Sequence, residues 1–418
     1  MNIKHLLSAI LLGSSISAVA QNSNVAYAIT GDGNRDYLWM NIRQVDLGNG
    51  QVGNTIFQRS NTAFTLTDVK SKAIVTQAAT TNGNIFSDRN YPTTSFVAAA
   101  AVDNRSNRLF FTPMRMNELR WLNLDIKNET PSFFTLQSDV LKFGDVNDEA
   151  NHITRMVIAG DGNGYAVTND GNHLIKFTTA RTPVITDLGN LVDAEKNPVS
   201  VHNKCTSWGG DMIADAYGKL YIISAAHQVF VLDINSRIAT HAGTITGLPA
   251  GYTTNGAAVN ADGKIVVSSA NSFEGYFQCS LDNLAAVKIE GSDIKYNASD
   301  LANGNLLFQK EADAARQNAF ASAIPVTRDI PQGDNRIFPN PVTDNVFNIL
   351  FENRKEGNYT IVLTDLAGRT IQSKLVNISK GTQTQSMKLS GKPSKGMYMV
   401  KVLDEQKQVV FTERLVIQ

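Results

Sequence analysis

The segment DMIADAYGKLYII, residues 211–223, with QVFVLD at residues 228–233 shortly after it, is the stretch that decides the fold. Its apolar side chains alternate or run together over a few residues, which is typical of buried β-strands. Asp215 and Gly218 stand between the first two apolar runs. An aspartate followed closely by a glycine is a hairpin signal, because glycine tolerates a positive φ. The stretch therefore predicts three short antiparallel strands joined by tight turns.

The same order of strand, turn and strand recurs along most of the chain. The second strands of successive copies lie 41 to 56 residues apart, at Leu109, Tyr165, Leu220, Ile265 and Leu306. Residues 26–29 with residues 37–40 make a sixth copy, and residues 51–92 are either an insertion or a weak seventh. Units of this length with three or four strands are the signature of propeller blades. We therefore expect an all-β chain in which residues 21–326 form a β-propeller, with six blades favoured and seven as the alternative.

The hairpin at residues 215–221 has the pattern Asp-x-x-Gly-x-Leu-Tyr and resembles the repeat of six-bladed propellers of the NHL and SMP-30-like groups. The resemblance concerns the fold and implies no activity. We expect residues 24–29 to pair beside the strands of the last blade and close the ring, because a closed ring leaves few strand edges exposed. A β-helix and tandem β-sandwiches are the alternative folds.

Three further motifs follow one another at the end of the chain. They are an aromatic-Pro-Asn-Pro turn, an Asp-x-x-Gly-Arg turn and a Gly-x-Tyr strand, with the residues Phe338, Pro339, Asn340 and Pro341, then Asp365, Gly368 and Arg369, then Gly396, Tyr398 and Lys401. Proline has no N–H to donate to a sheet, so the two prolines mark an entry turn. From residue 398 to residue 402 the side chains alternate between two faces, as in a strand with one buried side. We expect a small Ig-like β-sandwich here.

Taken in order, these motifs resemble the C-terminal sorting domain of type IX secretion cargo, over residues 335–418. An ordinary Ig-like adhesion or spacer module is the alternative. The resemblance implies that the type IX translocon and its sortase act on the chain, and that the protein passes the periplasm and the outer membrane. It would then be secreted or anchored at the cell surface. Residues 327–334, in a stretch with two prolines, a glycine and little apolar periodicity, are expected to be the linker before this domain.

The N-terminus has the pattern of an export signal. Lys4 and His5 precede the apolar run Leu6–Leu12, and residues 18–20 are the small residues that signal peptidase accepts. We therefore expect residues 1–20 to be a signal peptide, since this apolar run is too short to span a membrane. No later window approaches about 18 uninterrupted apolar residues, so no transmembrane span is expected.

Charge and cysteine content exclude some classes of ligand. The chain has 38 basic and 38 acidic residues, and this balance argues against nucleic acid as a partner. Cys205 and Cys279 fit either a disulfide of an exported protein or two free thiols, and with scattered histidines they do not form a zinc site. No cofactor is expected. Asp32, Asn34 and Asp36 place oxygens at alternate positions, as calcium loops do, but the rest of such a loop is missing, so Ca²⁺ is the weaker alternative to a solvated turn.

The most unusual loop runs from His202 to Asp211, and loops on a rigid scaffold often carry function. Trp208 is placed to stack on a sugar ring, and Asp211 to accept hydrogen bonds from its hydroxyls. In the structural alternative, Trp208 packs between blades and Asp211 caps a turn. Catalytic residues stay unknown, because the chain has none of the common catalytic motifs. The sequence favours a protein that binds a glycan, a peptide or a surface partner, with an extracellular hydrolase or lyase of polymers as the alternative.

Overall fold

The computed structural model describes most of the chain, namely residues 23–33, 36–60, 63–76, 86, 88–126, 130–291, 296–315, 336–365, 368–379, 381–391 and 394–418. The chain divides into two compact units, Met1–Asn318 and Ala319–Gln418, which are described separately. The expected signal peptide, residues 1–20, and the expected linker, residues 327–334, lie outside the described residues.

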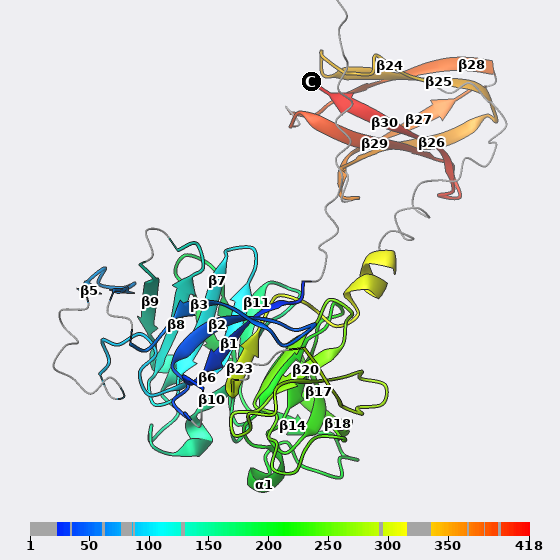
Figure 1. Ribbon diagram of the computed structural model, residues 1–418. Coiled ribbons are helices and arrows are strands. Elements are labelled where there is room, and N and C mark those ends of the chain that lie inside the picture. The colour runs from blue at the N-terminus through cyan, green and yellow to red at the C-terminus, as the bar shows by residue number, and fades with distance from the viewer. Residues whose placement is uncertain are drawn as a thin grey trace, which may run out of the picture. The chain divides into compact units, whose positions relative to one another are not determined.

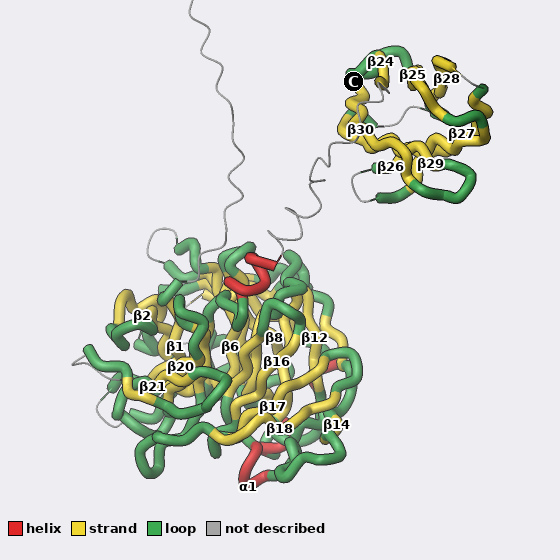
Figure 2. The backbone as a smooth tube through the Cα atoms, turned by 90° about the vertical axis from the view of Figure 1, so that its right-hand side faces the viewer, coloured by secondary structure: helices red, strands yellow, loops and turns green. Residues whose placement is uncertain are grey.

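The large unit is a propeller whose described strands form five blades arranged in a ring (Figures 1 and 2). Four of the blades follow the chain from an innermost to an outermost strand. The second blade contains β6 (Val97–Asp103), β7 (Arg108–Pro113), β8 (Glu118–Asn123) and β9 (Ser132–Gln137), and the third contains β10 (Ile153–Ile158), β11 (Asn163–Thr168), β12 (Leu174–Thr178) and β13 (Ile185–Asp187). The fourth contains β15 (Asp211–Ala214), β16 (Lys219–Ile223), β17 (Gln228–Asp233) and β18 (Ile238–Thr244), and the fifth β19 (Gly256–Val259), β20 (Ile265–Ser268), β21 (Phe277–Cys279) and β22 (Val287–Lys288).

The first blade is built from both ends of the unit. Its order is β23 (Ala298–Ala302), β1 (Val25–Thr30), β2 (Asn41–Asp46) and β3 (Val52–Phe57), with β23 innermost. Strands β1 and β23 pair antiparallel, with Tyr27 opposite Ala302 and Ile29 opposite Asp300, and they lie side by side in Figure 1. The expected closure of the ring by residues 24–29 is therefore confirmed.

Short elements extend the blades or lie in the loops between them. Strand β14 (Val192–Asp193) pairs parallel with β18, and β4 (Thr65–Asp68) and β5 (Ile74–Thr76) extend the second blade beyond β9. The short helices η2 (Asp139–Leu141), η3 (Glu149–Asn151) and α1 (Lys204–Ser207) lie in the connections before the third and fourth blades.

The expected six blades are corrected to five in the described residues. Residues 26–29 and the copy with its second strand at Leu306 are expected in separate blades, but β1 and β23, the strand just before Leu306, are neighbours in one sheet. Leu306 does not begin a second strand; only Leu307 forms a bridge, to Asp215, and residues 309–315 are helical. The interval 51–92 is not a seventh blade either, because β3 completes the first blade and β4 and β5 join the second.

Five clusters of buried apolar side chains hold neighbouring blades together, one at each contact between two blades. Alternate residues of a strand point to opposite faces of its sheet, so one strand serves two clusters. In β1, Ala28 packs toward the fifth blade and Ile29 toward the second. The β1 strand therefore contributes to the packing on both sides of the first blade.

The repeated aspartates have a structural role in the turns that join first and second strands. The carboxylates of Asp161 and Asp215 accept backbone N–H bonds from residues two positions ahead, at 3.0 and 2.8 Å. Asn260 makes the equivalent contact through its side-chain oxygen at 3.0 Å. These bonds replace backbone pairs that a tight turn leaves unmade. They explain why the same residue types recur from blade to blade.

The central channel of the ring is filled by side chains. Alanines dominate its wall, with Ala100, Ala101, Ala257 and Ala302 contributed by three different blades, and the remaining cavity is about 10 Å³. A single water needs roughly 10–15 Å³. Small side chains allow the innermost strands to approach closely, and each innermost strand contacts the next around the ring. This part of the channel therefore offers no room for a ligand.

The second unit is a β-sandwich of two antiparallel sheets. One sheet has the order β24 (Arg336–Phe338), β25 (Val346–Arg354) and β28 (Gly381–Lys388), and the other β27 (Thr370–Ile378), β26 (Gly357–Thr364), β29 (Gly396–Leu403) and β30 (Val409–Ile417). Inward-facing residues of both sheets, including Phe347, Ile361 and Val400, form a separate core. In β29, Tyr398, Val400 and Val402 are buried while the residues between them are partly exposed, which confirms the expected alternation.

Ile29→Ala tests the closing strand. Ile29 is fully buried, so removing its side chain is expected to lower the free energy of unfolding by about 2–5 kcal/mol. Val25 lies on the same strand but is 46% exposed, and Val25→Ala is expected to change it by less than about 0.5 kcal/mol. Urea unfolding of both variants measures the difference, and equal effects would contradict the role given to β1.

Candidate functional site

The loops of the propeller form two faces of different character. Because the same up-and-down order repeats in every blade, all innermost strands begin on one face, here called the entry face, and end on the other, the exit face. The connections between successive blades and those between second and third strands lie on the entry face. Asp32, Asp36 and the loop from His202 to Trp208, which were singled out from the sequence, lie on this face.

The loop from His202 to Trp208 is fastened to the third blade. The Trp208 indole N–H donates to the carbonyl of His202 at 3.1 Å, and the Lys204 ammonium lies 4.8 Å from the indole ring centre. The His202 ring nitrogens contact the carbonyls of Asp170 and Leu191, at 2.6 and 3.2 Å. These contacts join His202 and Trp208 in one folded loop and engage the polar atoms of both rings.

Asp211 lies inside the ring and away from solvent. Its carboxylate accepts the backbone N–H groups of Met212 at 2.7 Å and Ala257 at 2.6 Å, so it links the fourth and fifth blades. It also contacts the carboxyl group of Asp300, and both residues are fully buried. Burial raises the pKa of both carboxyls well above the ordinary value, and for Asp300 the charge of Asp211 adds to this shift. Asp211 therefore has no surface to offer a sugar in this conformation.

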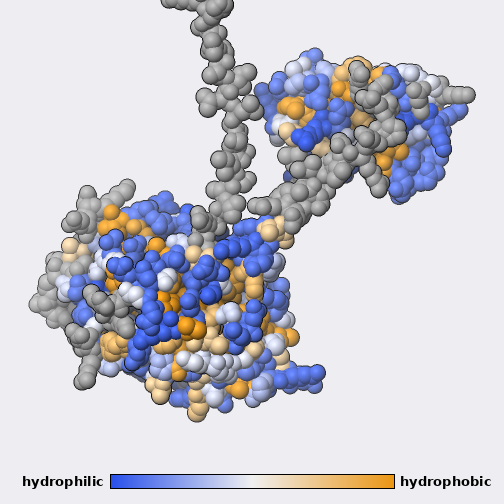
Figure 3. All heavy atoms as spheres, turned by 45° about the vertical axis from the view of Figure 1, so that its right-hand side comes forward, coloured by the Kyte–Doolittle hydropathy of each residue, from blue (hydrophilic) through white to orange (hydrophobic). Residues whose placement is uncertain are grey.

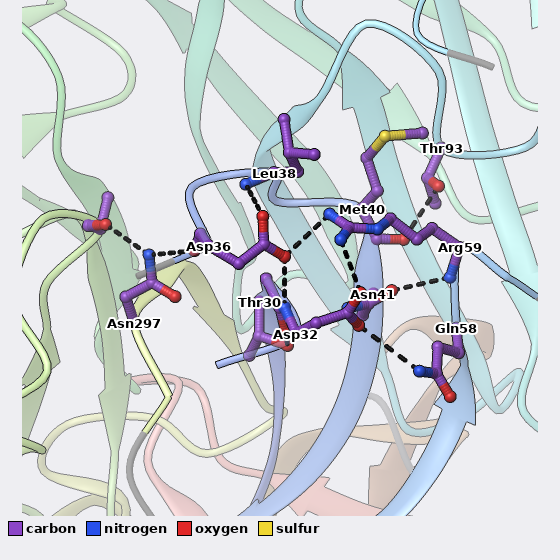
Figure 4. A network of polar contacts seen from close by, with 12 residues as sticks. Thr30, Asp32, Asp36, Leu38, Met40, Asn41, Gln58, Arg59, Thr93 and Asn297 are labelled. Carbon is purple, nitrogen blue, oxygen red and sulfur yellow. Dashed lines mark hydrogen bonds and ion pairs between the residues drawn. The ribbon is translucent and has the colours of Figure 1, made fainter. Parts of the chain in front are cut away.

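Asp32 and Asp36 form a polar network with Arg59, as Figure 4 shows, and Asp32 also pairs with Arg43. The Arg59 guanidinium lies 2.6 Å from Asp32 and 2.8 Å from Asp36, and Arg43 lies 3.6 Å from Asp32. Asn41 donates its amide N–H to Asp32 at 2.6 Å. Two carboxylates and two guanidinium groups cancel in charge. The network thus holds the loop between β1 and β2 above the first blade.

This arrangement bears on the calcium hypothesis for Asp32, Asn34 and Asp36. Asn34 lies outside the described residues. The guanidinium groups of Arg59 and Arg43 supply the positive charge beside Asp32 and Asp36 that a bound cation would otherwise supply. Within the described part of the chain, no group of three or more His, Cys, Asp or Glu side chains is arranged to hold a metal ion.

One exposed aromatic ring and three partly buried ones lie beside this network. Tyr37 is 46% exposed and meets Phe273, from the loop between β20 and β21, edge to face with 5.8 Å between ring centres. Trp39 meets Phe96 in the same manner at 6.2 Å. The two pairs connect the fifth, first and second blades. Together they form an aromatic row on the entry face, defined as Tyr37, Phe273, Trp39 and Phe96.

Buried polar atoms without a hydrogen-bond partner gather in the same sector. Leaving aside Arg59 and Asp300, whose carboxylate contacts are given above, such side-chain atoms in the described residues all lie at the entry ends of the first, second and fifth blades. They are Trp39 Nε1, Thr94 Oγ1, Thr112 Oγ1, Tyr276 Oη and Asn297 Oδ1. A buried polar group without a partner costs about 1–3 kcal/mol. Such a concentration needs an explanation in bound water or function.

No motif in the sequence marks this sector directly. Tyr37 and Trp39 were assigned to a strand, but β2 begins only at Asn41. The loop that they occupy becomes visible only when β1 is seen to pair with β23. Figure 3 shows apolar side chains scattered among hydrophilic ones on one face of the large unit.

The two cysteines are both free. Cys205 is exposed beside Trp208, and Cys279 is buried in the fifth blade. Burial raises the pKa of the Cys279 thiol to about 11. Of the two expected arrangements, the structure therefore has two free thiols.

The C-terminal motifs occupy the turns and last strands of the β-sandwich. Asn340 bonds to the backbone of β30 on both sides, donating to the carbonyl of Arg414 at 2.7 Å and accepting from the N–H of Val416 at 2.9 Å. Phe338, Pro339 and Pro341 surround it, so the first motif is fastened to the end of the chain. In the second motif, Asp365 accepts the backbone N–H of Arg369 at 2.9 Å and its Nε–H at 2.7 Å.

The third motif forms strand β29. Gly396 begins this strand, and the Tyr398 hydroxyl donates to the carbonyl of Ser394 at 2.7 Å. Lys401 is partly exposed on the outer face. In the turn of the second motif, Gly368 has a φ of +80°, which favours glycine.

Comparison with known proteins identifies this unit. Residues 336–418 match the family described as the secretion system C-terminal sorting domain. The protein therefore carries a type IX sorting domain and is cargo of that system, exported to the cell surface or beyond it. Within the described ranges, every helix is too short or too polar to traverse a bilayer.

No curated protein matches the chain. Among solved structures, it is similar to the extracellular domain of a one-component system of B. thetaiotaomicron, with 10% identity over 91% of this chain and 48% of that one and a TM-score of 0.32. It is also similar to PorZ, a surface component of the type IX secretion system of Porphyromonas gingivalis, with 13% identity, 94% and 51% coverage and a TM-score of 0.28. The chain thus spans about half the length of these two proteins. Virginiamycin B lyase of Staphylococcus aureus gives 11% identity, 77% and 84% coverage and a TM-score of 0.29. Such scores transfer no activity to this chain.

Asp300→Asn tests the buried carboxyl pair. The raised pKa values of Asp211 and Asp300 mean that the folded state keeps a proton that the unfolded chain has already lost. This contribution to stability is present at acidic pH, below the unfolded pKa, and is lost as pH rises through the folded pKa. The variant has one titrating group fewer, so its melting temperature relative to the wild type is expected to rise from about pH 4 toward neutral pH.

The control for this prediction is the same substitution at a surface aspartate. Asp282 is exposed, and Asp282→Asn is expected to follow the wild type at every pH. Thermal unfolding across the pH series measures all three proteins. A difference in melting temperature between Asp300→Asn and the wild type that stays constant with pH would contradict the raised pKa values.

Proposed function

We propose that the propeller is an extracellular binding module that holds a glycan on its entry face, at the aromatic row. The observation that carries the proposal is that the aromatic row and polar atoms without a hydrogen-bond partner lie in the same sector. Tyr37 and Phe273 offer apolar faces on which a sugar ring can pack. Trp39 Nε1 and Asn297 Oδ1 lie without partners in the same sector, where ordered water can relay hydrogen bonds to sugar hydroxyls.

The charge of the sector supports a neutral ligand. Asp32 and Asp36 are matched by Arg43 and Arg59, so the polar network carries no excess of either sign. A strongly charged partner would gain little from such a surface. Neutral sugars present hydroxyl groups that both donate and accept, which suits a network of amides and balanced charges.

The hydrolase or lyase alternative has less support. Glycoside cleavage uses two carboxyl groups on either side of the scissile bond. Asp32 and Asp36 each form a close ion pair with Arg59, and Glu274, exposed in the same loop as Phe273, pairs with Lys288 at 3.2 Å. The other carboxyl pair, Asp211 with Asp300, is fully buried. We therefore favour binding over catalysis.

Tyr37→Ala tests the glycan site. Loss of the exposed ring is expected to weaken glycan binding about three- to tenfold, the range of one aromatic contact, with little change in melting temperature. The matched control is Tyr217→Ala, since Tyr217 is 61% exposed but lies in an exit-face turn. A glycan array followed by calorimetry on the best ligand provides the measurement.

Two results would count against the glycan site. One is an equal loss of affinity in Tyr37→Ala and Tyr217→Ala. The other is the absence of binding to any glycan on the array together with binding of a peptide or protein in a separate assay. The ligand would then belong to another class.

We further propose that signal peptidase, the type IX translocon and its sortase handle this chain, with the sorting domain as the recognised element. Removal of residues 336–418 is expected to leave the propeller in the periplasm, and fusion of these residues to a periplasmic reporter is expected to bring the reporter to the surface. Cell fractionation with immunoblotting measures both. Surface display of the truncated chain at the wild-type level would contradict the proposal.

A further inference from the structure

A hollow lies on the exit face, between the third and fourth blades. It has a volume of about 480 Å³, within the range of small-molecule sites, roughly 300–1,000 Å³. Its wall combines apolar side chains, Leu188 and Ile234 among them, with the polar groups of Asp161, Lys176 and Arg237. The filled channel separates this hollow from the entry face, so it is independent of the aromatic row.

The acidic group of this hollow has a structural task. Asp161 accepts hydrogen bonds from Asn163 and from the Tyr165 hydroxyl, the latter at 2.8 Å. Asp215 and Tyr221 repeat the hydroxyl contact in the fourth blade at 2.9 Å. Burial acts to raise the pKa of Asp161, but the hydrogen bonds from Asn163 and Tyr165 outweigh it, so the pKa is lowered and the group stays ionised. Asp161 is thus committed to its turn.

The two basic groups are less fully engaged. The ion pair of Lys176 with Asp161 measures 3.8 Å, which is too long for a hydrogen bond. Arg237 donates one N–H to the carbonyl of Leu188, and in the described residues no carboxylate forms an ion pair with it. Two cations therefore share a partly enclosed space with one anion, and that anion is already bonded elsewhere. The hollow carries an excess positive charge.

The backbone conformation at Arg237 belongs to its turn. Its φ is +60°, a left-handed conformation that glycine adopts at less cost than arginine. Lys72 has the same φ, and in both turns this residue donates its N–H to the carbonyl four positions back. Glycine is therefore compatible with the turn at position 237.

We propose that this exit-face hollow binds a small organic anion. Lys176 and Arg237 hold its carboxylate or phosphate group by charge-assisted hydrogen bonds, and Leu188 and Ile234 pack against the uncharged body of the ligand. Arginine suits this task because its fork of N–H groups matches both anions. This site and its ligand class are separate from the neutral glycan proposed for the entry face.

The probes are chosen to separate charge from shape. D-Glucuronate and D-glucose 6-phosphate each present one anionic group on a sugar-sized body, and D-glucose presents the same body without it. Calorimetry on the full-length protein is expected to show binding of at least one charged probe, with glucose weaker by about tenfold or more. The stronger of the two charged probes identifies the carboxylate or the phosphate as the preferred group. Equal binding of all three would overturn the proposal.

The variants assign the binding to this hollow. Lys176→Ala and Arg237→Gly are each expected to weaken the charged probe about tenfold. Arg237→Gly also relaxes the left-handed backbone, so its melting temperature should match or exceed that of the wild type, and loss of binding then cannot come from unfolding. Lys264→Ala removes an exposed lysine from the turn between β19 and β20 of the fifth blade and is the charge-matched control.

The outcomes are distinct from those for the entry face. Tyr37→Ala should leave binding of the charged probe unchanged, whatever its effect on glycans. Wild-type affinity in both Lys176→Ala and Arg237→Gly would refute the site, and so would an equal loss in Lys264→Ala, because binding would then follow net charge alone.

Discussion

The antiparallel pairing of β1 with β23 is the interaction on which the propeller depends. It joins residues more than two hundred and fifty positions apart into one sheet, with Tyr27 opposite Ala302. Without it, both β23 and β1 would expose an unpaired edge. The alternating side chains of β1 also fill the cores on both sides of the first blade. Closure with five blades draws the alanine-rich innermost strands together and fills the channel, so ligands have access only to the two faces.

The repeat of strands and turns could be predicted from the sequence because it rests on local physics. Apolar alternation places strands such as β16 and β17, and Asp215 with Gly218 places the turn before them. The number of blades could not be predicted in this way. Two half-blades, at residues 26–29 and 298–301, look like two separate copies, and only a pairing between distant residues unites them. The sorting domain could be predicted more readily from the sequence, because its motifs lie in short turns that local contacts stabilise.

The candidate sites show the same limit. Asp211 was selected for its place beside Trp208, but the loop turns inward after the tryptophan, and the carboxylate ends among backbone N–H groups of neighbouring blades. Asp32 and Asp36 have the spacing of a calcium loop. Their partner Arg59 lies just after β3, about twenty-five residues further along the chain. The spacing of the two aspartates does not predict an ion pair with such a distant residue. Residue type and spacing thus suggest chemistry, whereas burial and distant partners decide whether that chemistry reaches a ligand.

A closed ring with a filled channel allows its two faces to differ in chemistry. On the entry face, long connections bring aromatic rings, matched ion pairs and unpartnered polar atoms together, and the charges cancel. On the exit face, tight turns use their acidic residues for backbone bonds, so cations such as Lys176 and Arg237 are left in excess. Repetition itself creates this difference, because the third and fourth blades each contribute an aspartate, and the fifth an asparagine, that accepts backbone N–H groups in the turn. Basic residues are then free to vary from blade to blade, and a cationic hollow can arise between two blades without disturbing the ring.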